Sequence, residues 1–204
     1  MADQQKPDAR VELQEKTTPY QGFFQVDRYQ LKHQKHEGGW TPVLVRELFE
    51  RGHTVAVLPY DPERDSVVLV EQFRIGAYVA GVEPWLSEAI AGIIDVGEKA
   101  EEVAHREALE EANCKMTELI KIGEFVMSPG GCSETTAMFC GRVDSRGIGG
   151  VHGLAHEGED ILARAVPLDE ALKDLAEGRT VSAYAAIPLL WLQFNKASLQ
   201  AQWT

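Results

Sequence analysis

The stretch 92–114 reads GIIDVGEKAEEVAHREALEEANC, and its pattern of apolar and charged residues predicts a helix over 99–112. At about 100° per residue, one arc of the helix collects three glutamates, namely Glu107, Glu110 and Glu111. The apolar members of the same arc are Ala100, Val103 and Ala104. We therefore expect three carboxylates to extend the helix face that packs against the protein.

These carboxylates need positive charge nearby, because like charges at this spacing repel one another, and more strongly when they are desolvated. Arg106 cannot neutralise all three of them. A ligand set made only of oxygens favours Mg²⁺ or Mn²⁺ over zinc. The helix thus predicts a divalent metal site, and the alternative for such an acidic cluster is a solvated helix face.

The composition narrows the class of protein. The chain has 204 residues, which is typical of one domain, or of one domain with a small appendage. Its net charge of −12 disfavours nucleic acid as a partner, because the phosphate backbone is also negative. We expect no membrane span, since the longest nearly apolar stretch is only 185–192. Three cysteines without a C-x-x-C pair, behind a polar N-terminus, indicate free thiols and a cytoplasmic location.

Outside the acidic helix, strands and helices alternate without a regular βαβ rhythm, which predicts a mixed sheet flanked by helices. The expected strands are 23–31, 43–49, 54–60, 66–74, 85–90, 116–127, 135–143 and 161–166. The polar turn DPERD at 61–65 joins two of them into a hairpin. Two further helices are expected over 168–177 and 182–202, with Pro188 kinking or restarting the second. Residues 1–18 are expected to form a mobile tail or an irregular first strand, and 144–160 a long exposed loop.

The stretch 92–114 resembles the Nudix box, G-x5-E-x7-R-E-U-x-E-E-x-G-U, in which U is a bulky aliphatic residue. The positions in register are Gly92, Glu98, Arg106, Glu107, Glu110 and Glu111. With average residue usage, six such matches arise by chance with a probability on the order of 10⁻⁵. Asn113 replaces the last glycine of the box. Because Asn also adopts the left-handed conformation, we expect the helix end and the activity to be retained.

The resemblance implies an α+β fold, a Nudix-type α/β/α sandwich with a mixed β-sheet, and hydrolysis of a nucleoside diphosphate linked to another moiety. In this family the box binds Mg²⁺, for which Mn²⁺ can substitute, with two or three ions per active site. The resemblance implies as metal ligands Glu107, Glu110, Glu111, Glu159 and the carbonyl of Ala91. It assigns a structural role to Gly92 and to an ion pair between Glu98 and Arg106, with a direct contact of Arg106 to phosphate left open.

Over nearly the whole chain the resemblance is to the ADP-ribose diphosphatase branch of this family. Pro129, fifteen positions after Cys114, is a marker of that branch. The branch implies an enzyme that cleaves ADP-ribose to AMP and ribose 5-phosphate by water attack on the diphosphate. It also implies a homodimer, in which an N-terminal β region (residues 1–52) is swapped between copies and residues 53–204 form the Nudix hydrolase domain.

The same resemblance implies roles for the substrate-binding residues. Phe23 stacks on adenine, Arg46 and Glu47 flank the base, Arg74 holds the diphosphate, and Glu134 accepts hydrogen bonds from ribose. Glu157, in the mobile loop 152–160, is the candidate general base, and His156 in that loop stays open as an alternative.

Two other functions stay open at this point. One is cleavage of a different nucleotide sugar, such as GDP-mannose, and the other is a Nudix-like module that senses a nucleotide without cleaving it. The matches at Phe23, Arg46, Pro129 and Glu134 favour ADP-ribose. The retained metal glutamates favour catalysis over sensing.

Overall fold

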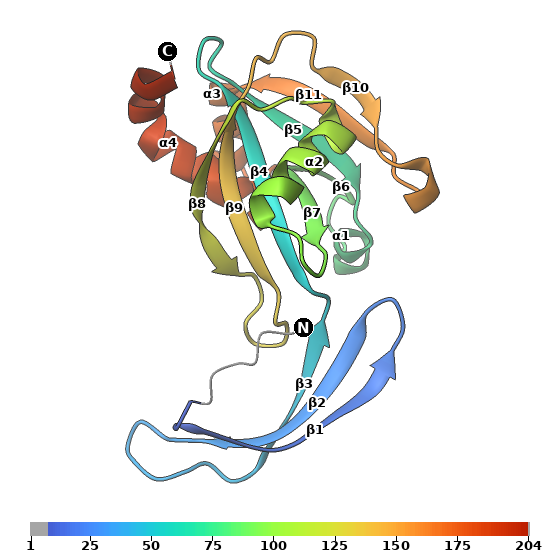
Figure 1. Cartoon of the computed structure of the whole chain (residues 1–204), viewed down its shortest axis with the longest axis vertical. Coiled ribbons are helices and arrows are strands. Elements are labelled where there is room, and N and C mark those ends of the chain that lie inside the picture. The colour runs from blue at the N-terminus through green and yellow to red at the C-terminus, as the bar shows by residue number, and fades with distance from the viewer. Residues whose placement is uncertain (1–7, 204) are drawn as a thin grey trace. The chain divides into compact units, whose positions relative to one another are not determined.

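The computed structural model describes residues 8–203 and divides the chain into two compact units (Figure 1). The first unit contains the described residues up to His53 together with Val126–Thr135. The second contains Thr54–Phe125 and the chain from Thr136 onward. Within residues 8–203 no helix is long and apolar enough to cross a membrane.

The first unit is built on a three-stranded antiparallel sheet of β1 (Val11–Gln21), β2 (Gln25–His33) and β3 (Leu44–Glu50), in that order. Every residue of β1 is exposed, and its register on β2 shifts twice. The expected irregular first strand is therefore present from Val11. The part of the predicted tail that precedes residue 8 lies outside the described residues.

The second unit contains a mixed sheet with the strand order β10-β11-β5-β4-β9-β8, while β6 pairs with β5 and β7 pairs with β4. Its strands are β4 (His53–Asp61), β5 (Ser66–Phe73), β6 (Trp85–Glu88), β7 (Ile90–Ile94), β8 (Glu118–Val126), β9 (Thr135–Arg142), β10 (Gly149–His152) and β11 (Ile161–Pro167). The strands β4 and β9 run parallel, whereas β4 and β5 form the predicted antiparallel hairpin. The prediction of a mixed sheet is confirmed.

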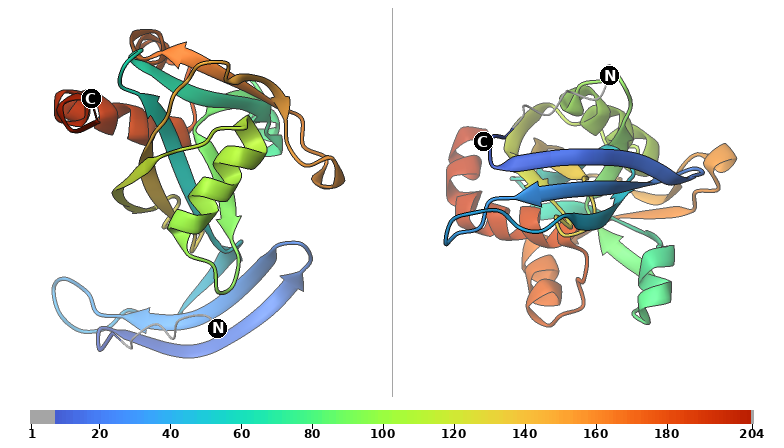
Figure 2. Two further views of the ribbon diagram at one scale, coloured as in Figure 1. Left: turned by 45° about the horizontal axis from the view of Figure 1, so that its top comes forward. Right: turned by 90° about the horizontal axis from the view of Figure 1, so that it is seen from below.

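Helices cover both faces of this sheet (Figure 2). They are α2 (Ala100–Ala112) on one face, and α3 (Leu168–Ala176) and α4 (Ala183–Trp203) on the other. Successive strand residues point to opposite faces, so Val55 and Val57 pack under α2 while Leu58 and Tyr60 pack under α3 and α4. The α/β/α layering follows from this double-sided burial.

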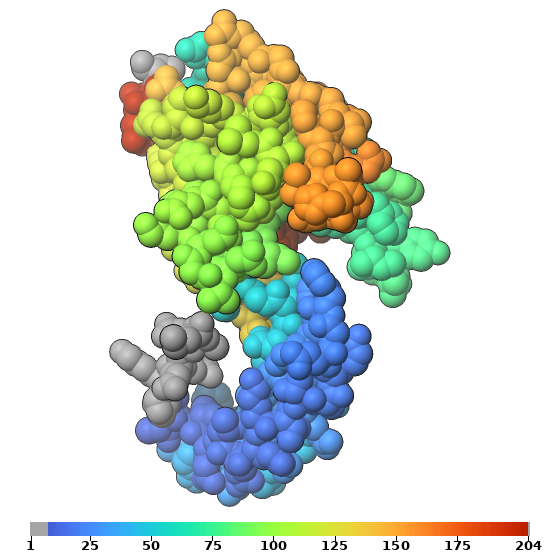
Figure 3. Space-filling model, turned by 45° about the vertical axis from the view of Figure 1, so that its right-hand side comes forward, coloured from blue at the N-terminus to red at the C-terminus, as the bar shows by residue number. Residues whose placement is uncertain are grey.

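Three local features differ from, or refine, the predictions. Helix α1 (Ile75–Ala80) was not predicted, because its six residues show no periodic contrast between apolar and polar positions, and none of them is buried. The predicted long loop contains β10 and the short helix η1 (Ala155–Glu157), and β10 lies alongside α2 (Figure 3). Helix α4 runs through Pro188 without restarting. Asn113 adopts the expected left-handed cap, with φ 47° and ψ 38°.

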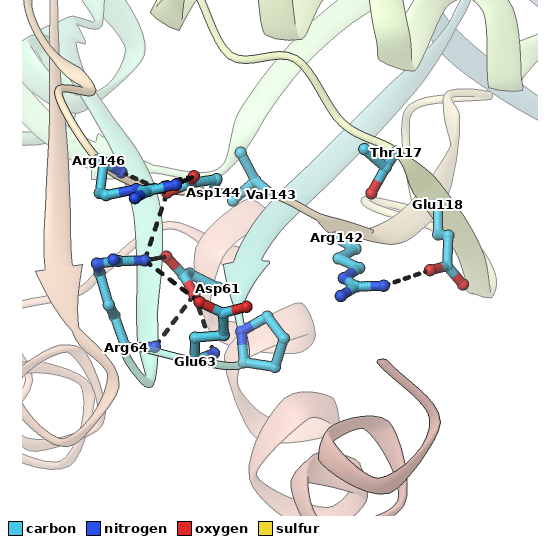
Figure 4. A pocket seen from close by; sticks show the side chains of 10 residues that line it. Asp61, Glu63, Arg64, Thr117, Glu118, Arg142, Val143, Asp144 and Arg146 are labelled. Atoms are coloured by element: carbon cyan, nitrogen blue, oxygen red, sulfur yellow. Dashed lines mark hydrogen bonds and ion pairs between the residues drawn. The ribbon is translucent and has the colours of Figure 1, made fainter. Parts of the chain in front are cut away.

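The turn between β4 and β5 is held by a buried carboxylate, Asp61, which is 1% exposed. It accepts hydrogen bonds from the backbone N–H of Ser145 at 2.9 Å and from its hydroxyl at 2.7 Å. The backbone and side chain of Arg64 add bonds of 3.1 Å each. Burial opposes ionisation of Asp61, but these hydrogen bonds outweigh it and hold its pKa below the ordinary value. The residue borders a cavity of about 450 Å³ that also exposes Arg142 and Arg146 (Figure 4).

We expect Asp61→Asn to lower the free energy of unfolding at pH 7 by roughly 2–4 kcal/mol. Both oxygens of the Asp61 carboxylate accept hydrogen bonds, whereas an amide has only one oxygen that can accept them. The folded pKa lies below the unfolded one, so this stabilisation is present above about pH 4 and is lost as pH falls. Denaturant unfolding at several pH values measures it, with the exposed Glu63→Gln as control. Equal stability of Asp61→Asn and wild type at pH 7 would contradict this role.

Candidate active site

The buried end of the site is formed by helix α2 and strand β7. Glu111, on α2, is 3% exposed, and its Oε2 accepts a hydrogen bond from the backbone N–H of Ala91 at 3.2 Å. Ala91 lies in β7, at the start of the segment that leads to the helix. The structure thus brings together two of the residues predicted to bind metal.

Gly92 makes room for a third, Glu107. A Cβ atom added to Gly92 would lie 1.9 Å from Oε1 of Glu107 and 2.1 Å from its Cδ. Any larger residue at this position would therefore displace the carboxylate. The first glycine of the box is required by this close approach of a side chain.

Arg106 lies among the acidic residues of the box. Its Nη1 is 2.9 Å from Oε1 of Glu107 and 2.9 Å from Oε2 of Glu110. The predicted pair with Glu98 is present at a longer distance, 3.7 Å, from Nε of Arg106. The other oxygen of Glu98 accepts the backbone N–H of Asp95 at 2.9 Å, so Glu98 also holds the loop before the helix. The positive charge of one arginine is therefore shared among three carboxylates.

Burial makes these glutamates hard to ionise. It raises the pKa of Glu111 to about 8, with repulsion from Glu107 and Glu159 adding to the shift. It raises the pKa of Glu107 to about 7, where Glu110 and Glu159 also repel and Arg106 partly compensates. Arg74 acts on Glu111 in the opposite direction, because its positive charge favours the carboxylate. The site therefore has a deficit of positive charge.

This deficit and the all-oxygen donor set fit a divalent cation. In the part of the chain from residue 8 to 203, however, no group of three or more His, Cys, Asp or Glu side chains is arranged to hold a metal ion. Arg106 already contacts Glu107 and Glu110, so a cation would compete with it for the same oxygens. The glutamates of the box thus fit a divalent ion in the chemistry of their oxygen donors and in their burial, whereas their side chains are not arranged around a common point.

The loop that carries the candidate base is attached to the same helix. The backbone N–H of Gly153 donates to the carbonyl of Glu110 at 3.3 Å. Glu159 turns back into this loop, where its Oε2 accepts the backbone N–H of Leu154 at 2.9 Å. The side chain of Glu157, in η1, is 56% exposed, and Nε2 of His156 lies 3.5 Å from its Oε1. Glu159 lies close enough to influence the helix glutamates, whereas Glu157 faces solvent.

Arg74 lies between β5 and α1. Its Nε donates to Oε2 of Glu88 at 2.5 Å, and the Ser182 hydroxyl donates to the other oxygen of Glu88. Glu88 and Ser182 were not predicted as site residues. The one available signal was a lone carboxylate at the end of a short strand, β6, of sequence WLSE.

The remaining predicted residues belong to the first unit. The Phe23 side chain is 88% exposed and packs edge-on against Phe24, with ring centroids 4.7 Å apart. Arg46 and Glu47 are adjacent and exposed on β3. Glu134 is 5% exposed, and its Oε2 lies 3.3 Å from Nη1 of Arg51.

Arg51 was not predicted as part of this group. Its guanidinium lies 5.7 Å from the centroid of the Phe24 ring, so it connects Glu134 to the pair of phenylalanines. Nothing in the local sequence marks Arg51, because its partner Glu134 is 83 positions away. A functional role for Glu134 therefore has to be compatible with this buried ion pair.

The sandwich and the acidic helix together define a Nudix domain, and the model of that domain family matches residues 50–186. The chain therefore belongs to the Nudix hydrolase family, and the resemblance drawn from the box is confirmed. A solved structure, described as an ADP compounds hydrolase, superposes with a TM-score of 0.66. It covers 94% of this chain and 98% of its own at 22% identity, which shows the shared fold.

Within the family, the chain is similar to curated ADP-ribose pyrophosphatases. It is 42% identical to that of Escherichia coli strain K12 over 193 residues, covering 95% of this chain and 92% of the relative. It is 44% identical to that of Haemophilus influenzae over 196 residues, with 95% and 90% covered. A GDP-mannose pyrophosphatase of Enterobacter sp. strain 638 is more distant, at 34% over 152 residues, with 74% and 78% covered.

Proposed function

We propose that this protein hydrolyses ADP-ribose to AMP and ribose 5-phosphate in a reaction that depends on a divalent metal. The observation that carries the chemistry is that the carboxylates of Glu111 and Glu107, on α2, lie against two consecutive residues of β7, Ala91 and Gly92. The observation that favours this substrate is the higher identity to ADP-ribose pyrophosphatases than to the GDP-mannose enzyme.

The metal ligands in this proposal are the carboxylates of the box and loop, with one carbonyl: Glu107, Glu110, Glu111, Glu159 and Ala91. Two or three Mg²⁺ ions are proposed for each active site, and Mn²⁺ is proposed to substitute. When bound, such ions neutralise the nonbridging phosphate oxygens and lower the pKa of water. The carboxylates of Glu111, which is buried, and Glu107, which is partly buried, supply negative charge that the protein itself compensates only in part.

Other residues of the chain are proposed to bind the substrate and to activate the attacking water. Arg74 binds the diphosphate through its guanidinium, whose planar shape suits phosphate oxygens. Glu157 removes the proton from the attacking water, since its exposed carboxylate is on a loop attached to α2 through Gly153. Glu98 and Arg106 hold the loop and helix of the box in register. Phe23, Arg46, Glu47 and Glu134 bind the adenosine.

Two copies are proposed to associate through the N-terminal β region, residues 1–52, with residues 53–204 as the Nudix domain. The sheet of β1, β2 and β3 exposes Val11, Leu13, Tyr20, Val45 and Phe49, each by more than a third. A sheet of this kind needs a second layer to bury its apolar face. Light scattering at micromolar concentration is expected to give twice the 22.6 kDa chain mass, and a monomer would contradict the swap.

A cytoplasmic location is also part of the proposal. Cys114, Cys132 and Cys140 are free thiols, and two of them are buried. Unpaired thiols are typical of a reducing compartment. A small phosphorylated molecule is the proposed partner rather than nucleic acid, because the net charge of −12 repels a phosphate backbone.

The proposal is tested by incubating the full chain with ADP-ribose and Mg²⁺ and separating the products by chromatography. AMP and ribose 5-phosphate formed in equal amounts over many turnovers are the expected result. A parallel panel should include GDP-mannose, and a higher kcat/KM for it would replace ADP-ribose as the substrate. Binding without turnover on every member of the panel would indicate a sensing module instead.

Replacing Phe23 tests the proposed adenine contact. We expect Phe23→Ala to raise KM for ADP-ribose about tenfold with little change in kcat, because stacking stabilises the bound substrate and the transition state alike. Steady-state kinetics measure both constants. Phe194→Ala is the matched control, since Phe194 is 84% exposed on α4. A fall in kcat at constant KM would contradict the stacking role.

A further inference from the structure

A chain of three side chains connects the start of α4 to Arg74. Nε of Arg74 donates to Oε2 of Glu88 at 2.5 Å, and the Ser182 hydroxyl donates to Oε1 of the same carboxylate. Glu88 is 5% exposed, whereas the Arg74 side chain is 39% exposed. A buried carboxylate therefore holds a guanidinium that reaches solvent.

We propose that Glu88, held in place by Ser182, is a positioning residue that aims the Arg74 guanidinium at the diphosphate. The inference rests on the proposed function for the role of Arg74. It adds two residues, from β6 and from the segment before α4, that the Nudix box does not contain.

The geometry of the guanidinium supports this role. Arginine has five N–H donors in a rigid plane, and Glu88 is bonded to the one on Nε. This contact occupies Nε and orients the plane of the group, and it leaves the edge formed by the two Nη atoms open for two parallel bonds to a phosphate. Because the charge of Arg74 already lowers the pKa of Glu111, the guanidinium lies within electrostatic reach of the proposed metal ligands.

The burial of Glu88 explains why its contact with Arg74 has a fixed direction. A carboxylate that is almost out of water needs hydrogen bonds on both oxygens, and Arg74 and Ser182 supply one to each. Ser182 is itself held, because its Oγ accepts the backbone N–H of Tyr184 at 3.3 Å. The Glu88 carboxylate thus has one favoured orientation, and its bond to Nε orients the flexible Arg74 side chain.

The alternative is that the pair only stabilises the fold, and a double-mutant cycle separates the two roles. Glu88→Leu removes the acceptor and Arg74→Ala removes the guanidinium. We expect each single variant to lower kcat/KM for ADP-ribose at least tenfold, and the double variant to be no worse than Arg74→Ala. Glu88→Gln keeps an oxygen for Nε and is expected to retain kcat/KM within about threefold of wild type.

Stability is measured on the same proteins. Arg74→Ala leaves a buried carboxylate unpaired, so Glu88→Leu in that background is expected to raise the unfolding midpoint without restoring activity. Glu71→Gln is the matched control, because Glu71 pairs with Arg164 at 2.7 Å on the neighbouring strands. Wild-type kcat/KM in folded Glu88→Leu, or additive losses in the double variant, would overturn the positioning role.

Binding of inorganic pyrophosphate with Mg²⁺, measured by calorimetry, separates this inference from the proposed substrate. If wild type cleaves no nucleoside diphosphate, the proposed function fails, and this binding still tests Glu88. We expect Arg74→Ala and Glu88→Leu each to weaken pyrophosphate binding about tenfold, whereas Glu88→Gln and Glu71→Gln bind as wild type does. Unchanged binding by Glu88→Leu would overturn the inference.

Discussion

Replacing Glu111 by Gln is expected to lower kcat at least a hundredfold, with KM for ADP-ribose changed by less than about threefold. The amide has the shape of the carboxylate and can still accept the backbone N–H of Ala91. It lacks the negative charge that the proposed metal site requires, and that charge acts mainly in the transition state. Glu111 is 3% exposed, and burying a neutral amide costs less free energy than burying a carboxylate. The variant is therefore expected to be at least as stable as wild type.

Steady-state kinetics at saturating Mg²⁺ and a thermal unfolding curve test this expectation together. Glu102→Gln is the matched control, since Glu102 is on the same helix with its side chain 67% exposed. Turnover of Glu111→Gln within about threefold of wild type would mean that Glu111 is not a metal ligand.

Gly92→Ala is expected to lower kcat/KM about a hundredfold through a single added methyl group. That group would lie 1.9 Å from Oε1 and 2.5 Å from Cγ of Glu107, so the carboxylate has to leave its place. Gly92 is not among the glycines with positive φ, and alanine meets no backbone strain there. Since the displaced atoms are the end of a flexible side chain, the unfolding midpoint is expected to change little.

The measurement is kcat/KM over a range of Mg²⁺ concentrations, because a displaced ligand should raise the concentration needed for half-maximal activity. Gly76→Ala is the control, as a Cβ at Gly76 meets nothing within 4 Å. Wild-type kinetics in Gly92→Ala would show that Glu107 does not act from the position it occupies beside β7.

Much of the second unit could be predicted because its signals are local. The helix over 100–112 follows from apolar spacing along a few turns, and the cap at Asn113 follows from the conformational freedom of one residue type. The hairpin of β4 and β5 follows from a polar turn between two apolar runs. Helix α1 escaped prediction because its exposed, apolar residues carry no periodic contrast.

The candidate site also combines features that local spacing predicts with features that it does not predict. The spacing along α2 predicts that Glu107, Glu110 and Glu111 share one face, since those positions are separated by less than two turns. The spacing does not predict that Arg106 pairs more closely with Glu107 and Glu110 than with Glu98, because all three are within reach of its long side chain. Rotamer choice, decided by packing, selects among them.

The family, the acidic helix and the chemistry of its donors could all be inferred from the amino-acid sequence, because they depend on residue type and on spacing within one helix. The pairing of residues far apart in the chain, by contrast, depends on the folded layers. Ser182 reaches Glu88 across 94 positions of sequence, and Arg51 reaches Glu134 across 83. Such pairs form because the folded sheet buries a carboxylate, which then needs hydrogen-bond donors from whichever segments pack against it, and burial is a property of the packed layers rather than of any local pattern.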